Sequence, residues 1–172
     1  MAAIPKMATT VILLRERTQG FEVLLLKRHE KSSFMAGNFV YPGGRIDRED
    51  GLPEICAFCQ GLSAEEARLI LGEPISGEES LAFWVGGIRE LFEEAGVLLA
   101  YDRPGGSLVM PRLDEQGRFS QYRRPLQKRE ITLLQMAREE SLLFAADRLR
   151  YYARWNTGQQ LASLIILANW LP

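Results

Sequence analysis

Cysteine and histidine are scarce in this sequence of 172 residues. It contains two cysteines, Cys56 and Cys59, and a single histidine, His29. Two cysteines are too few for a disulfide-built scaffold and are consistent with a reducing compartment, so a cytoplasmic location is expected. One histidine excludes a histidine dyad and a multi-histidine metal site within one chain. The lone C-x-x-C lacks the second pair that would complete a zinc site, which favours a packing role.

An excess of charge of one sign and long apolar runs are also missing. The formal net charge is −1 at pH 7, so no long-range field gathers a nucleic acid or an anionic membrane. No segment approaches the ~20 apolar residues of a membrane span, and residues 1–6 lack the apolar core of a signal peptide. We therefore expect neither a nucleic acid nor a membrane as a partner.

The composition is that of a soluble globular protein. Hydrophobic residues make up 47% of the chain and charged residues 25%, far from disordered or fibrous extremes. The length falls in the range of roughly 100–200 residues that is usual for one domain. A single domain over residues 1–172 is expected.

The first part of the chain has the pattern of strands and turns. Residues 9–14 and 21–26 are β-branched and aliphatic runs joined by a short turn that ends at Gly20, which predicts a hairpin. Residues 38–41 predict a short strand that Pro42, Gly43 and Gly44 stop.

Helical spacing dominates the middle of the chain. Residues 51–78 have the character of an insertion, with a short helix at 64–71 that Ser63 caps. A longer helix is predicted from Glu79 to Ala95 and ends at Gly96, followed by a buried strand at 97–100.

Three further elements are expected downstream. Helical patterning returns over 126–144, and residues 151–155 form an aromatic, strand-like run. Residues 161–171 are apolar with helical spacing at Leu161, Leu164 and Ile165.

Three carboxylates stand close together on the predicted helix of residues 79–95. Glu90, Glu93 and Glu94 occupy positions i, i+3 and i+4, so their side chains are neighbours that repel unless a positive charge lies between them. Hard dications such as Mg²⁺ or Mn²⁺ suit oxygen ligands of this kind. A solvated acidic helix face, as in a helical interaction protein, is the alternative.

The surrounding string resembles a known family signature. Residues 89–97 read Arg-Glu-Leu-Phe-Glu-Glu-Ala-Gly-Val and follow Gly43, Gly44 and Asp47 in the chain. This resembles the Nudix box of the Nudix hydrolases, in which Gly, five residues, Glu and seven residues precede Arg-Glu-apolar-x-Glu-Glu-x-Gly-apolar. Asp50 stands where the early Glu would be, and about thirty extra residues separate it from Arg89.

An insertion at this point is similar to that of one subgroup, the peroxisomal coenzyme A diphosphatases and their bacterial relatives. The strings at residues 23–28, 34–37 and 40–44 are similar to that subgroup as well. The resemblance implies an α/β (α+β) fold, namely a Nudix-type α/β/α sandwich with a mixed β-sheet. It also implies cleavage of the diphosphate bond of a nucleoside diphosphate linked to another group, coenzyme A or acyl-CoA among them.

The resemblance assigns roles to individual residues. Mg²⁺ or Mn²⁺ would be held by Glu90, Glu93 and Glu94, with a backbone carbonyl of the glycine segment, that of Gly43, completing the shell. Arg89 would orient Glu93 or a neighbouring carboxylate through a charge-assisted bond. A glutamate would accept the proton of the attacking water. The expected substrate contacts are Arg28, Gly44 and Asp47.

The resemblance fails near the end of the chain. The subgroup continues after its Trp-x-Thr element with a proline, a strand and a helix, whereas residues 158–172 here form an atypical tail. We therefore expect the C-terminal part of the fold to be incomplete, and an exposed apolar tail to favour a homodimer. The changed tail and the missing early Glu also leave open a Nudix-like module that binds a nucleotide derivative with weak or no turnover.

Overall fold

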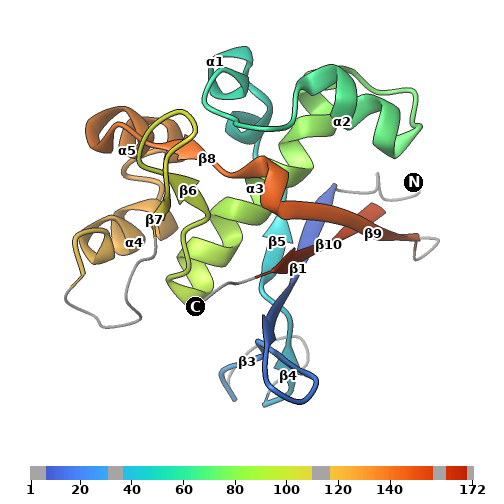
Figure 1. Cartoon of the computed structure of the whole chain (residues 1–172), viewed down its shortest axis with the longest axis vertical. Coiled ribbons are helices and arrows are strands. Elements are labelled where there is room, and N and C mark those ends of the chain that lie inside the picture. The colour runs from blue at the N-terminus through green and yellow to red at the C-terminus, as the bar shows by residue number, and fades with distance from the viewer. Residues whose placement is uncertain (1–6, 31–36, 110–116, 157–161, 170–172) are drawn as a thin grey trace.

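The computed structural model of the chain describes residues 7–30, 37–109, 117–156 and 162–169. Its main sheet has the strand order β2-β1-β10-β9, and β5 also pairs with β1. The pair β1–β10 is parallel and the other pairs are antiparallel, so the sheet is mixed, as expected. Figure 1 shows this sheet packed beside helix α3. The strands are β1 (Ala8–Glu16), β2 (Phe21–Val23), β5 (Gly43–Arg45), β9 (Leu149–Asn156) and β10 (Ala162–Asn169).

The predicted N-terminal hairpin is confirmed. Strands β1 and β2 pair with Leu14 opposite Val23, and the turn closes where the Arg17 amide donates to the Gly20 carbonyl at 3.1 Å. The second run does not continue as one strand, because β3 (Leu26–Lys27) pairs separately with β4 (Phe39–Val40). This small sheet projects from the body of the molecule (Figure 1).

The predicted short strand at 38–41 is present as β4 and ends before Pro42, but Gly43 and Gly44 then open a new strand that the sequence did not predict. Gly43 and Gly44 open β5 and lie opposite Thr10 and Thr9 of β1. The absence of side chains explains this, since a Cβ on Gly43 would lie 2.4 Å from the Thr9 carbonyl oxygen. Two backbones approach here at a distance that any side chain would prevent.

Helix α3 (Gly77–Ala95) is the centre of the core. Ser76 accepts a hydrogen bond from the Glu79 amide at 3.1 Å and Glu79 accepts one from the Ser76 amide at 2.9 Å, a capping box that starts the helix two residues before the predicted Glu79. Gly96 ends it in the left-handed conformation, as predicted. The largest fully buried side chains of the protein come from α3 and the elements around it: Trp84, Phe92, Phe144, Leu13, Ile55, Leu81, Ile88, Leu91, Leu98, Met136 and Leu142.

The inserted residues form a helical layer against α3. They comprise the last residue of the 3-10 helix η1 (Arg48–Gly51), followed by α1 (Pro53–Cys56) and α2 (Ala64–Leu71). Helix α2 has its predicted bounds, with Ser63 as its cap and Gly72 left-handed at its end. Figure 1 shows α1 and α2 on the same side of the molecule as the start of α3.

The C-x-x-C lies in this layer and is tightly packed. The thiol of Cys56 donates to the Leu52 carbonyl and that of Cys59 to the Ile55 carbonyl, each at 3.6 Å. Burial raises the pKa of Cys59 to about 12, so its thiol stays protonated near neutrality. These contacts fit the packing role that was favoured.

Two helices replace the single helix predicted over residues 126–144. Helix α4 (Ser120–Gln127) and helix α5 (Leu133–Glu140) are separated by a turn in which Arg129 has a φ of 58°. Thr132 then caps α5, with its side chain accepting from the Gln135 amide at 3.1 Å. A left-handed residue and a new N-cap are incompatible with one continuous helix.

A third, small sheet accompanies these helices. Strands β6 (Ala100–Tyr101), β7 (Leu108–Val109) and β8 (Leu143–Phe144) pair in the order β7-β6-β8. The predicted strand at 97–100 is therefore displaced, and only Ala100 of it lies in β6. The 3-10 helix η2 (Ala146–Arg148) then leads into β9, which contains the predicted run 151–155.

The apolar tail is a strand, so its helical spacing was misleading. Within residues 162–169, β10 lies between β1 and β9, with Ala8 opposite Ser163 and Asn156 opposite Ala162. An apolar run flanked by strands on both sides is typical of a central strand. The tail therefore contributes to the sheet, whereas residues 158–161 and 170–172 lie outside the described residues. The homodimer stays a prediction.

In the part of the chain that the structure describes, no helix combines the length and apolarity needed to cross a membrane.

Candidate active site

The three predicted glutamates lie in the last turns of α3, and two of them reach strand β5. The Gly43 amide donates to Glu94 Oε2 at 3.0 Å. A Cβ built on Gly44 would lie 2.5 to 2.7 Å from the carboxylate atoms of Glu90, so this carboxylate rests directly on the glycine backbone. Residues that lie fifty apart in sequence are thus brought together because neither glycine carries a side chain.

Arg89 connects the cluster to the start of the insertion. Its guanidinium donates to both oxygens of Asp50 at 2.9 Å, to Glu90 Oε1 at 2.9 Å and to Glu93 Oε1 at 3.4 Å. It also donates to the Arg45 carbonyl at 2.8 Å. Only 8% of the Arg89 side chain and 2% of the Asp50 side chain are exposed. Asp50, and not Glu93, is the principal partner of Arg89, and the orienting role of Arg89 stays a prediction.

Asp50 is held on several sides. Besides Arg89, its carboxylate accepts the Asp47 backbone amide at 2.9 Å. Gly86 of α3 makes room for it, because a Cβ there would lie 3.0 Å from Asp50 Oδ2 and 2.7 Å from Ile46 Cδ1. Asp50, directly before the inserted residues, is therefore fixed against α3.

The electrostatics of the cluster are those of crowded, partly buried acids. Burial raises the pKa of Glu90 to about 7, with the charges of Glu93 and Glu94 adding to the shift and Arg89 opposing it. Burial also raises the pKa of Glu93. Burial would lower the pKa of Arg89, but the neighbouring carboxylates outweigh it and raise that pKa. One guanidinium thus faces more negative charge than it can neutralise.

The carboxylate oxygens of the cluster are of the kind that a hard dication binds. Glu90, Glu93 and Glu94 offer carboxylate oxygens side by side, and the surplus negative charge favours a cation. Among the described residues, however, no three acidic, histidine or cysteine side chains are placed as a ready metal cluster. In the arrangement seen, Glu90 and Glu93 bond to Arg89 and Glu94 bonds to the Gly43 amide.

Helix α4 fixes the end of α3 from outside. Arg123 donates to the carbonyls of Phe92 at 3.2 Å, Glu93 at 3.0 Å and Glu94 at 3.1 Å. Gln127 donates to the Glu93 carbonyl at 2.6 Å. These carbonyls belong to the last turn of α3, where backbone acceptors commonly lack intrahelical partners, although the Phe92 carbonyl also accepts from the Gly96 amide at 2.9 Å. No sequence motif marks Arg123 or Gln127, and sequence reasoning missed both.

We expect Arg123→Ala to loosen the turn that carries Glu93 and Glu94. Loss of the charged donor should lower the free energy of unfolding by about 1–2 kcal/mol, because Arg123 is only half-buried. Amide hydrogen exchange at residues 95–97 should accelerate, as mass spectrometry would measure. Arg124→Ala, an exposed arginine of the same helix, is the control. Equal exchange in both variants would show that Arg123 does not hold the turn.

Comparison with known proteins decides the family. The family model described as the NUDT19 Nudix domain matches residues 2–165. The chain belongs to this Nudix family. The Acyl-coenzyme A diphosphatase NUDT19 of Xenopus laevis is 30% identical over 169 residues, which covers 83% of this chain and 43% of that protein. The protein of the same name from Gallus gallus is 29% identical over 166 residues, which covers 80% of this chain and 43% of its own length. The chain thus spans less than half of each relative.

A solved structure confirms the fold of this Nudix domain. The crystal structure of a NUDIX hydrolase from Alicyclobacillus acidocaldarius superposes with a TM-score of 0.74 and covers 97% of this chain and 70% of that one, at 21% identity. The predicted Nudix-type mixed α and β fold is therefore confirmed, as is the resemblance to the coenzyme A diphosphatase subgroup.

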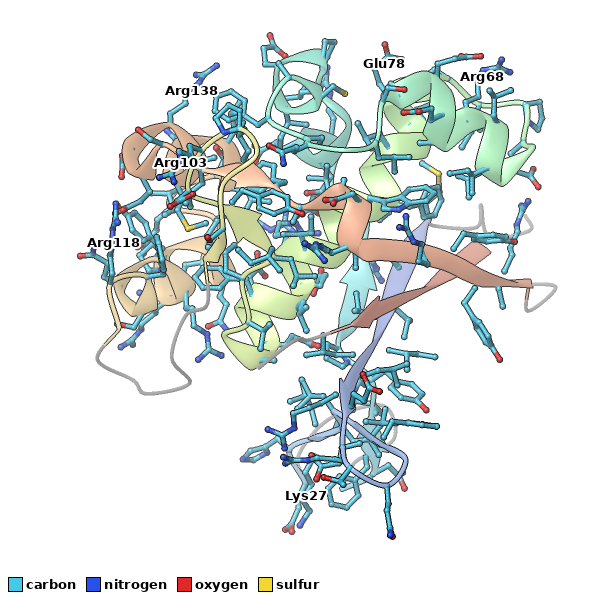
Figure 2. All side chains as sticks on the ribbon, viewed as in Figure 1. Lys27, Arg68, Glu78, Arg103, Arg118 and Arg138 are labelled. Carbon is cyan, nitrogen blue, oxygen red and sulfur yellow. The ribbon has the colours of Figure 1, made fainter. Side chains whose placement is uncertain are left out.

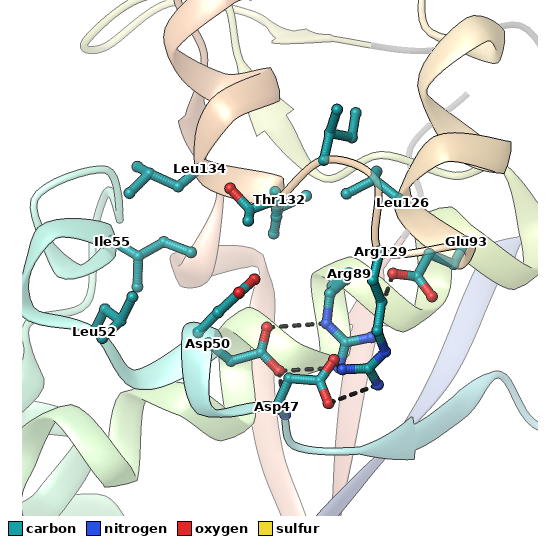
Figure 3. A pocket seen from close by; sticks show the side chains of 13 residues that line it. Asp47, Asp50, Leu52, Ile55, Arg89, Glu93, Leu126, Arg129, Thr132 and Leu134 are labelled. Carbon is teal, nitrogen blue, oxygen red and sulfur yellow. Dashed lines mark hydrogen bonds and ion pairs between the residues drawn. The ribbon is translucent and has the colours of Figure 1, made fainter.

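A pocket adjoins the acidic cluster of the Nudix domain. It measures about 140 Å³ and lies between η1 and α1 on one side and the α4–α5 segment on the other. Arg89, Glu93, Asp47 and Asp50 line its polar part (Figure 3). Arg129 crosses its edge and donates to Asp47 Oδ1 at 3.0 Å, with 74% of the Arg129 side chain exposed.

The remaining predicted site residues divide into two groups. Gly43, Gly44 and Asp47 lie at the cluster or the pocket, and their metal and substrate roles stay predictions. Arg28 follows β3 on the projecting hairpin and does not line the pocket. Figure 2 shows the neighbouring Lys27 at the opposite end of the molecule from Arg103 and Arg138. A substrate contact by Arg28 stays a prediction.

Proposed function

We propose that this Nudix domain hydrolyses the diphosphate bond of a nucleoside diphosphate derivative, with coenzyme A or an acyl-CoA as the substrate and Mg²⁺ or Mn²⁺ as the metal. The observation that carries the proposal is the placement of Glu90 and Glu94 against β5, with Arg89 bonded to both Glu90 and Glu93. The names of the two relatives, both acyl-coenzyme A diphosphatases, support the substrate class.

A bound dication would neutralise the diphosphate, stabilise charge developing at phosphorus and lower the pKa of a bound water. Glu90, Glu93, Glu94 and the Gly43 carbonyl are the groups that would hold it. One glutamate of the cluster accepts a proton from the attacking water. Arg89 keeps Glu90 and Glu93 at fixed positions through its anchor on Asp50, a positioning role. Gly44 and Asp47 face the site and are proposed to contact the substrate.

The pair between Asp50 and Arg89 bears on the alternative of a module without turnover. That alternative rested partly on the missing early Glu, yet Asp50 binds Arg89 through both carboxylate oxygens. An acid therefore still pairs with the arginine of the motif, which weighs against the alternative.

Hydrolysis assays on wild type and Glu93→Gln test the proposal. Coenzyme A, an acyl-CoA, ADP-ribose, NADH and diadenosine polyphosphates would be incubated with Mg²⁺ or Mn²⁺ and the products separated. We expect metal-dependent cleavage of coenzyme A compounds and a loss of at least about 100-fold in kcat/KM for Glu93→Gln.

The matched control is Glu78→Gln, which removes the same charge from the first turn of α3 (Figure 2). It should retain wild-type activity. Retention of most activity by Glu93→Gln would remove Glu93 from the catalytic machinery. A folded wild type that cleaves none of these compounds would favour the binding-module alternative.

A further inference from the structure

The pocket beside the cluster has two apolar walls of different origin. Leu52 and Ile55 form one wall and belong to the inserted residues. Leu126 of α4 lies on the other side, and Ile131 and Leu134 of the α4–α5 segment also line the space. Figure 3 shows Ile55 and Leu134 on one side of the space and Leu126 on the other, with Thr132 between the walls.

The polar end of the pocket is continuous with the cluster. Glu93 and Arg89 line both, so a group in the pocket lies next to whatever binds at the glutamates. The insertion is tied to this end, because Leu52 comes two residues after Asp50, which Arg89 holds. The apolar wall from the insertion therefore has a fixed position relative to Glu93.

The lining indicates what kind of group fits. It includes four carboxylates, Asp47, Glu49, Asp50 and Glu93, against two guanidiniums, Arg89 and Arg129, so its charge disfavours a phosphate inside the pocket. None of the side chains that line it is aromatic, which leaves no ring on which a nucleotide base would stack. Aliphatic walls instead favour an uncharged, aliphatic group.

We propose that this pocket receives the pantetheine arm of a coenzyme A compound, with the dimethyl-substituted carbon next to the diphosphate packed between Leu126, Ile131 and Leu134. The inference rests on the proposed function, since it places the diphosphate at the glutamates. It gives the insertion a role in substrate choice: Leu52 and Ile55 close the pocket on the side opposite α4. ADP-ribose, which carries a polar sugar at that position, fills the apolar pocket less well.

The two halves of coenzyme A test this placement without turnover. 4′-Phosphopantetheine and adenosine 3′,5′-bisphosphate contain no diphosphate bond, so their dissociation constants can be measured with Mg²⁺ present by calorimetry. Leu134→Trp narrows the pocket from a half-buried position. It should weaken binding of 4′-phosphopantetheine about tenfold or more and change that of the bisphosphate less than about twofold. Leu69→Trp, at a position 66% exposed on α2, should change neither.

The outcomes are distinct. If Leu134→Trp weakens binding of the bisphosphate alone, the nucleotide and not the pantetheine arm lies in the pocket, and the proposal is overturned. Equal weakening of both ligands, or no change in either, would also overturn it. If Leu134→Trp fails to fold, Ile131→Trp narrows the same space. Failure of wild type to bind 4′-phosphopantetheine also overturns the proposal. Selective binding by a wild type that does not cleave coenzyme A would instead refute the proposed hydrolysis and leave the pocket assignment standing.

Discussion

Asp50→Ala is expected to lower the free energy of unfolding by about 3–5 kcal/mol. The substitution leaves the Arg89 guanidinium buried without its bidentate partner, while the Asp47 amide loses its acceptor. Glu90 and Glu93 still bond to Arg89, but each accepts through a single oxygen. Guanidinium unfolding followed by circular dichroism would measure the change.

Glu49→Ala is the matched control, because Glu49 is an exposed carboxylate one residue away in η1. It should change the free energy of unfolding by less than about 0.5 kcal/mol. A similarly small change for Asp50→Ala would mean that water reaches Arg89 and replaces the carboxylate. The buried pair of Asp50 and Arg89 would then contribute little to the free energy of unfolding.

Gly43→Ala is expected to cost at least about 3 kcal/mol of stability and to separate β5 from β1. Gly43 has a φ of 154°, and its added Cβ would lie 2.4 Å from the Thr9 carbonyl oxygen and 2.7 Å from Thr10 Cα. Both are backbone atoms of β1, so neither can turn aside as a flexible side chain could. Thermal unfolding would register the loss as a lower Tm.

Substitutions at two other glycines distinguish the cost of a strained backbone from the cost of a steric clash. Gly20 has a φ of 80° and open space around its Cβ position, so Gly20→Ala should cost only about 1 kcal/mol. The three atoms nearest to a Cβ on Gly44 all belong to the Glu90 carboxylate, the far end of a flexible side chain, so Gly44→Ala should displace Glu90 with little loss of stability. If Gly43→Ala proves as mild as Gly20→Ala, the contact with β1 does not limit the fold.

Local signals in the sequence predicted those elements that are determined locally. Helix α2 has its predicted bounds because the Ser63 side chain caps its start and Gly72 readily takes the left-handed conformation that ends it. The glutamates of α3 were found because i, i+3 and i+4 spacing places them on one helix face whatever surrounds the helix. The capping box of Ser76 and Glu79 was an available signal for the start of α3, and it was overlooked.

The remaining features depend on contacts between distant segments. An apolar run of eight residues fits a buried strand or a helix, and only pairing with β1 and β9 makes β10 a strand. The break between α4 and α5 occurs at Arg129, a residue type that gives no hint of a positive φ. Arg123 contacts backbone carbonyls about thirty positions earlier. Every residue has such a carbonyl, so the sequence does not indicate which of them a side chain will bind.

The position of β10 also constrains how the protein is made. Within the described residues, β9 joins the main sheet only through β10, and β10 lies parallel to β1, more than 150 positions earlier in the chain. Residues up to Asn169 must therefore have left the ribosome before β9 can join the sheet. Until then, the edge of β1 that pairs with β10 has no partner strand. During that interval the growing chain exposes an unpaired strand edge, the kind of edge that can pair with another chain and promote aggregation.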